Sequence, residues 1–115
     1  MRIYLCKQGE PGQLAEIKNE LKELQETVGG YIEAVRLQSN LILICNDESK
    51  LNGSLPNRWC RGDIICGDFF FCGVDGEDFC DVPEDLLALI NAFYGPPQYD
   101  KEGERIGCRL KKTKS

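Results

Sequence analysis

The residues best suited to binding chemistry lie in one polar stretch, NDESKLNGSLPNRWCR, at positions 46–61. It supplies amide, hydroxyl and cationic groups, and Gly53 lets a ligand approach the backbone closely. An arginine can hold a phosphate through two parallel hydrogen bonds, and an aromatic ring can stack on a base. We therefore expect a ligand site formed by Tyr31, Asn46, Lys50, Asn52, Asn57, Arg58, Trp59 and Arg61.

This set suits a ligand that combines a phosphate with a base. In that interpretation Arg58, Lys50 and Arg61 hold the phosphate, the three asparagines read polar edges, and Tyr31 or Trp59 stacks. A structural alternative stays open, in which the asparagines cap turns and Arg58 pairs with a carboxylate. The stretch contains no G-x-x-x-x-G-K-[ST] motif, so a P-loop is excluded.

Histidine is absent from the chain, which excludes Ser-His-Asp triads, Cys-His dyads and histidine-ligated metals. No other pairing of a nucleophile with a base can be recognised. We expect no catalytic residue, no enzymatic activity and no cofactor. The acidic segment 75–85 lacks the D-x-[DN]-x-[DN]-G pattern of a calcium loop, so we expect a solvated face or a partner surface there and no metal site.

Seven cysteines occur, and no two of them have C-x-x-C spacing. Most lie in apolar, strand-like runs, where a free cysteine behaves as a small hydrophobic residue. We expect reduced core thiols, as in a cytoplasmic protein. Cys60 is the one cysteine with an arginine on each side in the sequence, Arg58 and Arg61, which is the setting in which a thiol can become reactive.

The net charge of −5 is unevenly spread along the chain. Residues 101–115 carry six basic and two acidic side chains, or +4, and residues 1–100 carry eight and seventeen, or −9. An acidic body repels the backbone of duplex nucleic acid. We expect one domain over residues 1–94 and a basic, partly disordered tail over 95–115.

Apolar periodicity places the elements of the first half of the chain. Residues 2–7 favour a strand, and residues 14–18 a second one paired back on it. Leu21, Leu24 and Val28 mark one face of a helix that Asn19 would cap and Gly29-Gly30 would end. Residues 31–46 favour a β-hairpin at the centre of the sheet, with the helix packed across it.

The second half begins with the polar stretch, which we expect to be a long loop anchored on the core. Residues 64–74 favour a strand, with a bulge or close approach at Gly67. Pro83 opens a second helix that ends at Gly95. This order indicates an α+β domain with a small, mostly antiparallel sheet and two helices.

Two segments, residues 26–59 and 62–79, carry a resemblance. The motifs are VGGYIE after the helix, LICN and KLNG around position 50, PNR at 56–58, and GEDF at 76–79. In these the chain resembles a family catalogued as domain of unknown function 3846, over roughly residues 1–94. Members of that family look like small proteins of bacteriophages and Gram-positive mobile elements.

The resemblance implies a role in the host cytoplasm, where small acidic phage proteins antagonise host defence. We expect a non-enzymatic protein that sequesters a nucleotide-like signal through the 46–61 stretch, which could lie at the interface of a homo-oligomer. The alternative is an inhibitor that binds a host defence protein through its acidic face or its polar loop. Neither hypothesis involves duplex nucleic acid or a membrane.

Overall fold

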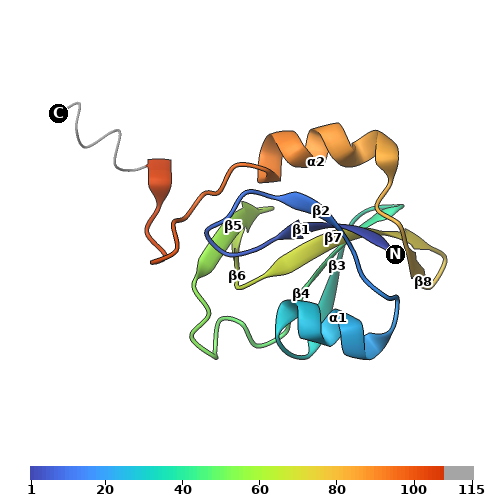
Figure 1. Cartoon of the computed structure of the whole chain (residues 1–115), viewed down its shortest axis with the longest axis horizontal. Coiled ribbons are helices and arrows are strands. Elements are labelled where there is room, and N and C mark those ends of the chain that lie inside the picture. Colours follow the sequence, from blue (N-terminus) through green and yellow to red (C-terminus); the bar gives the residue numbers. More distant parts are fainter. Residues whose placement is uncertain (108–115) are drawn as a thin grey trace.

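The computed structural model describes residues 1–107 and is built around one antiparallel sheet (Figure 1). The strands follow the order β2 (Gln13–Glu16), β1 (Arg2–Cys6), β7 (Phe69–Asp75), β4 (Leu41–Asn46) and β3 (Ile32–Gln38), and the short β8 (Asp78–Cys80) also pairs with β7. All pairings in it are antiparallel. With two helices, this makes the α+β class that the sequence predicted.

The helices lie on opposite faces of the sheet (Figure 1). Helix α1 (Leu21–Val28) packs Leu24 and Val28 against one face, and helix α2 (Leu87–Tyr94), which follows a short 3₁₀ turn at Glu84–Leu86, packs Ile90 against the other. Strand β4 and the core of β7 are therefore buried on both faces, which explains their continuous apolar sequences.

Three predicted details differ from the structure. The 31–46 hairpin is not central, because β3 forms the edge and β7 lies between β1 and β4. The strand predicted over 64–74 is two strands, separated where Gly67 adopts a φ of +74°. Asn19 does not cap α1, because the N-cap is Glu20 and the Asn19 amide donates to the carbonyl of Phe79.

The polar stretch 46–61 is not one long loop. Its second part forms β5 (Pro56–Cys60), which pairs with β6 (Asp63–Cys66) as a separate two-stranded hairpin. The turn of this hairpin places Arg61 at a φ of +54°, a left-handed conformation that is uncommon for arginine. Only residues 47–55 remain as an irregular loop between β4 and β5.

The chain after α2 packs back on the domain. Tyr99 is buried and pairs with Arg105 in an isolated β-bridge, and the Gln98 side chain accepts the backbone N–H of Trp59 at 2.8 Å. These residues were expected in the tail that begins at residue 95, and of them Gln98 contacts β5. The remainder of the predicted basic tail, residues 108–115, falls outside the described part of the chain.

Candidate functional site

Arg58 and Asn57 lie inside the domain. Arg58 is 0% exposed, and its guanidinium donates to the carbonyls of Glu10, Tyr94 and Gly95 and to Oδ1 of Asn57, at 2.6–3.3 Å. The Asn57 amide in turn donates to the carbonyls of Cys6 and Gly67.

These bonds join five separate segments of the chain. Burial lowers the pKa of Arg58, against the opposing influence of Cys6 and Tyr4. Arg58 therefore has a structural role, because its hydrogen bonds connect the β5–β6 hairpin to the end of α2. Its side chain has no exposed surface that a phosphate could contact. The structural alternative predicted that Arg58 pairs with a carboxylate. Its hydrogen-bond partners are instead three backbone carbonyls and the side-chain oxygen of Asn57.

Lys50 and Arg61, two further predicted site residues, also bind other residues of the protein. Lys50 forms an exposed ion pair with Asp63, with Nζ and Oδ1 2.6 Å apart, which raises the pKa of Lys50 and lowers that of Asp63. Arg61 reaches across to the β3 edge and donates to the carbonyls of Arg36 and Leu37. Trp59 keeps an exposed ring on β5.

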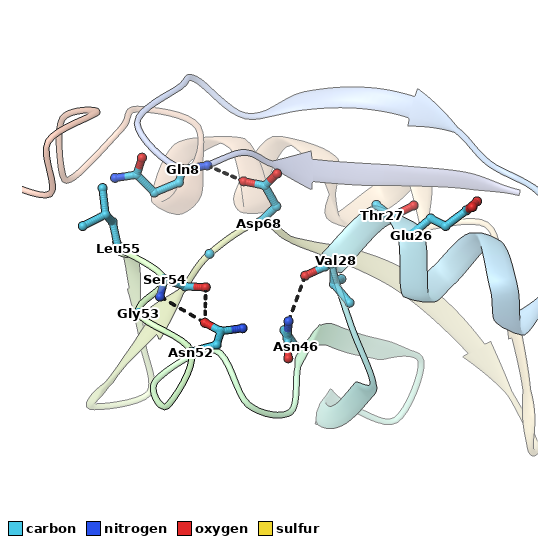
Figure 2. A pocket seen from close by; sticks show the side chains of 12 residues that line it. Gln8, Glu26, Thr27, Val28, Asn46, Asn52, Gly53, Ser54, Leu55 and Asp68 are labelled. Atoms are coloured by element: carbon cyan, nitrogen blue, oxygen red, sulfur yellow. Dashed lines mark hydrogen bonds between the residues drawn. The ribbon is translucent and has the colours of Figure 1, made fainter.

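A cleft of about 450 Å³ lies where the carbonyl end of α1 faces the 47–55 loop (Figure 2). The chain brings three further segments to it: Gln8 after β1, Asn46 at the end of β4, and Gly67-Asp68 between β6 and β7. A smaller hollow of about 230 Å³ shares Gly29, Asn46 and Asn52 with it and extends the cleft to Tyr31. The structure thus brings together three of the eight predicted site residues.

Asn46 and Asn52 shape this cleft through local hydrogen bonds. Buried Asn46 donates to the Val28 carbonyl at 3.3 Å and accepts the N–H of Glu48 at 2.8 Å, so it fixes the loop to the end of α1. Asn52 Oδ1 accepts both the N–H and the hydroxyl of Ser54. Figure 2 shows the Asn52 amide nitrogen turned across the cleft toward Asn46.

The electrostatic character of the cleft is negative. Asp68 lies at its upper wall, where Oδ1 accepts the N–H of Gln8 at 2.8 Å, and Glu26 lies at the rim on α1 (Figure 2). The carbonyl end of a helix adds partial negative charge, and here it is formed by Val28 and Gly29. Among the described residues that line the cleft, none is a lysine or an arginine.

Tyr31 supplies an aromatic face at the outer end of the cleft. Its side chain is 70% exposed, and Glu48 lines the same hollow. An exposed ring beside carboxylates attracts cations, because the negative face of the ring and the carboxylates act in the same direction. The ring could equally stack on a planar base, as the sequence analysis expects.

Sequence reasoning missed Gln8, Glu26 and Asp68 as parts of this site. Each comes from a different element, and no spacing in the sequence joins them. One signal was present, since Gly29 and Gly67 both adopt positive φ where the chain turns into the cleft. Glycines of this kind mark where backbone lies open, but they do not identify the side chains around it.

The described cysteines are free thiols, and most are buried in the two halves of the core. Burial raises the pKa of Cys6, Cys45 and Cys72 to about 12, which is the opposite of an activated thiol. Cys60 is buried as well, and its sulfur accepts the Tyr94 hydroxyl at 3.4 Å. Cys108 lies outside the described residues.

The comparison with known families gives one match, which covers most of the chain. The model of the domain of unknown function DUF3846 matches residues 1–95. The chain belongs to this family. The DUF3846 match ends at the close of α2, so residues 96–115 lie beyond it. No curated protein and no solved structure matches the chain. Within residues 1–107, no helix is long and apolar enough to span a membrane.

Proposed function

We propose that this DUF3846 chain is a binding protein whose cleft between α1 and the 47–55 loop takes a cationic ligand that donates N–H groups. The observation that carries the proposal is the lining of the cleft. It consists of two carboxylates, a helix carbonyl end and amide and hydroxyl groups, with no cationic side chain among the described lining residues. A guanidinium or ammonium group fits such a surface.

This proposal changes the ligand expected from the sequence. A nucleotide could still stack its base on Tyr31, but its phosphate would approach Asp68 and the carbonyl end of α1. Like charges within a few ångströms disfavour such a complex. Of the three residues assigned to the phosphate, Arg58 is buried inside the domain, and Lys50 and Arg61 do not line the cleft or its extension. A role in sequestering a nucleotide signal therefore receives support from Tyr31 alone, and a cation is the better fit.

A second candidate function, binding to another protein, rests on a different observation. Leu89 and Phe93 of α2 are half or more exposed, and they border a groove with Leu37 and Leu41. Exposed apolar side chains that gather in one place are typical of protein-binding surfaces. The acidic face at 75–85 is also exposed, apart from buried Val82 and the partly buried Phe79 and Pro83.

Thermal unfolding of the full chain with matched probes tests the first proposal. Agmatine, which carries a guanidinium and an ammonium group, is compared with adenosine and adenosine monophosphate. A ligand at about 100 times its Kd adds ~2.7 kcal/mol, on the order of 10 °C in midpoint for a domain of this size. We expect a rise with agmatine that disappears in Asp68→Asn/Glu26→Gln. A larger rise with the monophosphate than with adenosine or agmatine would overturn the proposal.

A further inference from the structure

We propose that the cation taken by the cleft is a basic peptide segment of another protein, bound in an extended conformation. This inference rests on the proposed function and deepens it, because it names the chemical class of the ligand. It is carried by the uncharged groups of the cleft. These groups pair with the backbone of a peptide, and a simple amine would leave part of them without partners.

Two asparagine amides in the middle of the cleft offer N–H groups that have no acceptor. Asn46 is only 6% exposed and lines both the cleft and its extension. Its amide nitrogen donates one N–H to the Val28 carbonyl at 3.3 Å, and the second N–H has no acceptor among residues 1–107. The amide nitrogen of Asn52 has none in the described chain either, and it is turned across the cleft (Figure 2). A ligand that brings acceptor oxygens is therefore favoured.

The end of α1 supplies the opposite kind of group. The N–H groups of Gly29 and Gly30 both donate to the Gln25 carbonyl, at 2.8 and 3.0 Å. Within residues 1–107, no N–H group therefore pairs with the carbonyls of Glu26 and Thr27, and both residues line the cleft. The cleft thus has unpaired acceptors as well as unpaired donors.

A peptide backbone combines the two groups that the cleft requires. Each residue of a peptide other than proline carries one C=O acceptor and one N–H donor. Ammonium and guanidinium groups carry donors alone, so a linear polyamine would match the charge of the cleft and leave the N–H groups of Asn46 and Asn52 unpaired. Loss of that pairing costs most at a buried group, which Asn46 is.

The charges of the cleft suit more than one basic side chain. Glu26 and Asp68 line the cleft, and Glu48 and the exposed ring of Tyr31 line its extension. No described residue that lines either hollow is a lysine or an arginine. Arginine pairs with a carboxylate through two parallel hydrogen bonds and stacks on an aromatic ring. In an extended peptide alternate side chains point the same way, so basic residues at every second position face one surface.

Calorimetric titration of the full chain at low ionic strength tests this inference. The peptide probe is acetyl-Arg-Ala-Arg-Ala-Arg-amide. It is compared with spermidine, which carries the same three positive charges and has no acceptor oxygen, and with agmatine. The decisive variant is Asn52→Asp. It keeps an oxygen that can accept the N–H and the hydroxyl of Ser54, and it replaces the unpaired amide N–H groups with a second acceptor.

We expect the peptide to bind the wild type about tenfold more tightly than spermidine, because it adds hydrogen bonds to the same charges. In Asn52→Asp the added negative charge should raise the spermidine affinity, and the loss of a donor should lower the peptide affinity. The ratio of the two affinities should therefore approach one. A ratio that Asn52→Asp leaves unchanged, or spermidine that binds the wild type as tightly as the peptide, would overturn the inference.

Two further variants locate the peptide on the protein. Asp68→Asn/Glu26→Gln should remove most of its binding, and Glu48→Gln should weaken it about threefold. Asp47→Asn is the matched control, because this neighbouring carboxylate is exposed and lines neither hollow. Peptide binding that withstands Asp68→Asn/Glu26→Gln, or equal effects of Asp47→Asn and Glu48→Gln, would overturn binding along the cleft.

The two proposals fail in different ways. Binding of agmatine and spermidine without a preference for the peptide would overturn the peptide inference and still support the proposed function. Peptide binding that Asn52→Asp weakens, with no binding of agmatine, would support the peptide inference and overturn the site for a free cation. A wild-type chain that binds none of the three probes would overturn both.

Discussion

Two polar regions of this domain lie close together in sequence and have opposite characters. Asn57 and Arg58 are fully buried, with their hydrogen-bonding groups directed at carbonyls of the domain itself. Asn52, only five residues earlier, lies on an open cleft and holds its own loop while its amide nitrogen faces the opening. Polar side chains in one stretch of sequence thus serve the fold in one region and present a surface in the other.

The difference arises from where the chain enters the domain. At Pro56 it begins a strand that is covered by the β1–β2 turn, α2 and the residues that follow α2. Buried polar groups must be paired, so Asn57 and Arg58 bind what surrounds them. Most side chains of residues 47–55 are exposed, and the carboxylates of Glu26 and Asp68 across the cleft are at least partly open to solvent. The comparison predicts large stability effects in the first region and large binding effects in the second.

Replacing Arg58 with alanine should give the largest loss of stability. The change leaves the carbonyls of Glu10, Tyr94 and Gly95 without this donor and creates a cavity inside the domain. We expect the free energy of unfolding to fall by about 3–5 kcal/mol, measured by urea denaturation with Trp59 fluorescence. Arg58→Lys, which keeps the charge with fewer donors, should lose less. An alanine variant as stable as the wild type would contradict this structural role of Arg58.

Asn46→Ala should lower the stability less than Arg58→Ala. Asn46 is buried like Arg58, but it makes fewer hydrogen bonds and also lines the cleft. It is buried and joins the Val28 carbonyl to the loop, but it supports one wall of the cleft only. We expect a loss of about 1–2 kcal/mol in the same denaturation experiment. Proteolysis within residues 47–55 should also become faster. An unchanged cleavage rate would show that Asn46 does not hold the loop.

Alkaline pH should weaken the core through its thiols. Burial raises the pKa of Cys6, Cys45 and Cys72 from 9.0 to about 12, so the folded state keeps protons that the unfolded chain releases. This contribution to stability is fully present below about pH 9 and is lost as the pH rises toward 12. Unfolding free energies measured at intervals from pH 8 upward should fall less steeply in Cys72→Val than in the wild type, and equal slopes would refute this origin.

Asp68→Asn/Glu26→Gln should have the smallest effect on stability. An asparagine at position 68 can still accept the Gln8 N–H, and Glu26 is exposed, so we expect a change of less than about 0.5 kcal/mol for the pair. The same changes should remove most of the cation affinity. A large loss of stability here would erase the contrast between the two regions, because the cleft would then also serve the fold.

Much of the sheet could be predicted from sequence, because each core strand carries its own signal. The apolar run at β4, the alternation in β3 and the glycines after α1 all indicated the elements that form. The order of strands carried no such signal. The hairpin 31–46 lies at the edge because β7, which is distant in sequence, inserts between β4 and β1.

The site was only partly predictable, for a related reason. Of the eight residues chosen by type as ligand-binding, Asn46, Asn52 and Tyr31 line the cleft or its extension. Type alone could not tell a buried arginine from an exposed one. The burial of Arg58 depends on contacts with Glu10, Tyr94 and Gly95, which are 36–48 residues away in sequence.

The central claim is that the cleft between α1 and the 47–55 loop prefers cations. Its most direct test is ¹⁵N NMR of the full chain titrated separately with agmatine and with adenosine monophosphate. The account predicts that agmatine shifts the amides of Gly29, Asn46, Asn52 and Gly53, and that these shifts are lost in Asp68→Asn/Glu26→Gln. Saturable shifts of the same amides by the monophosphate, with no response to agmatine, would contradict it.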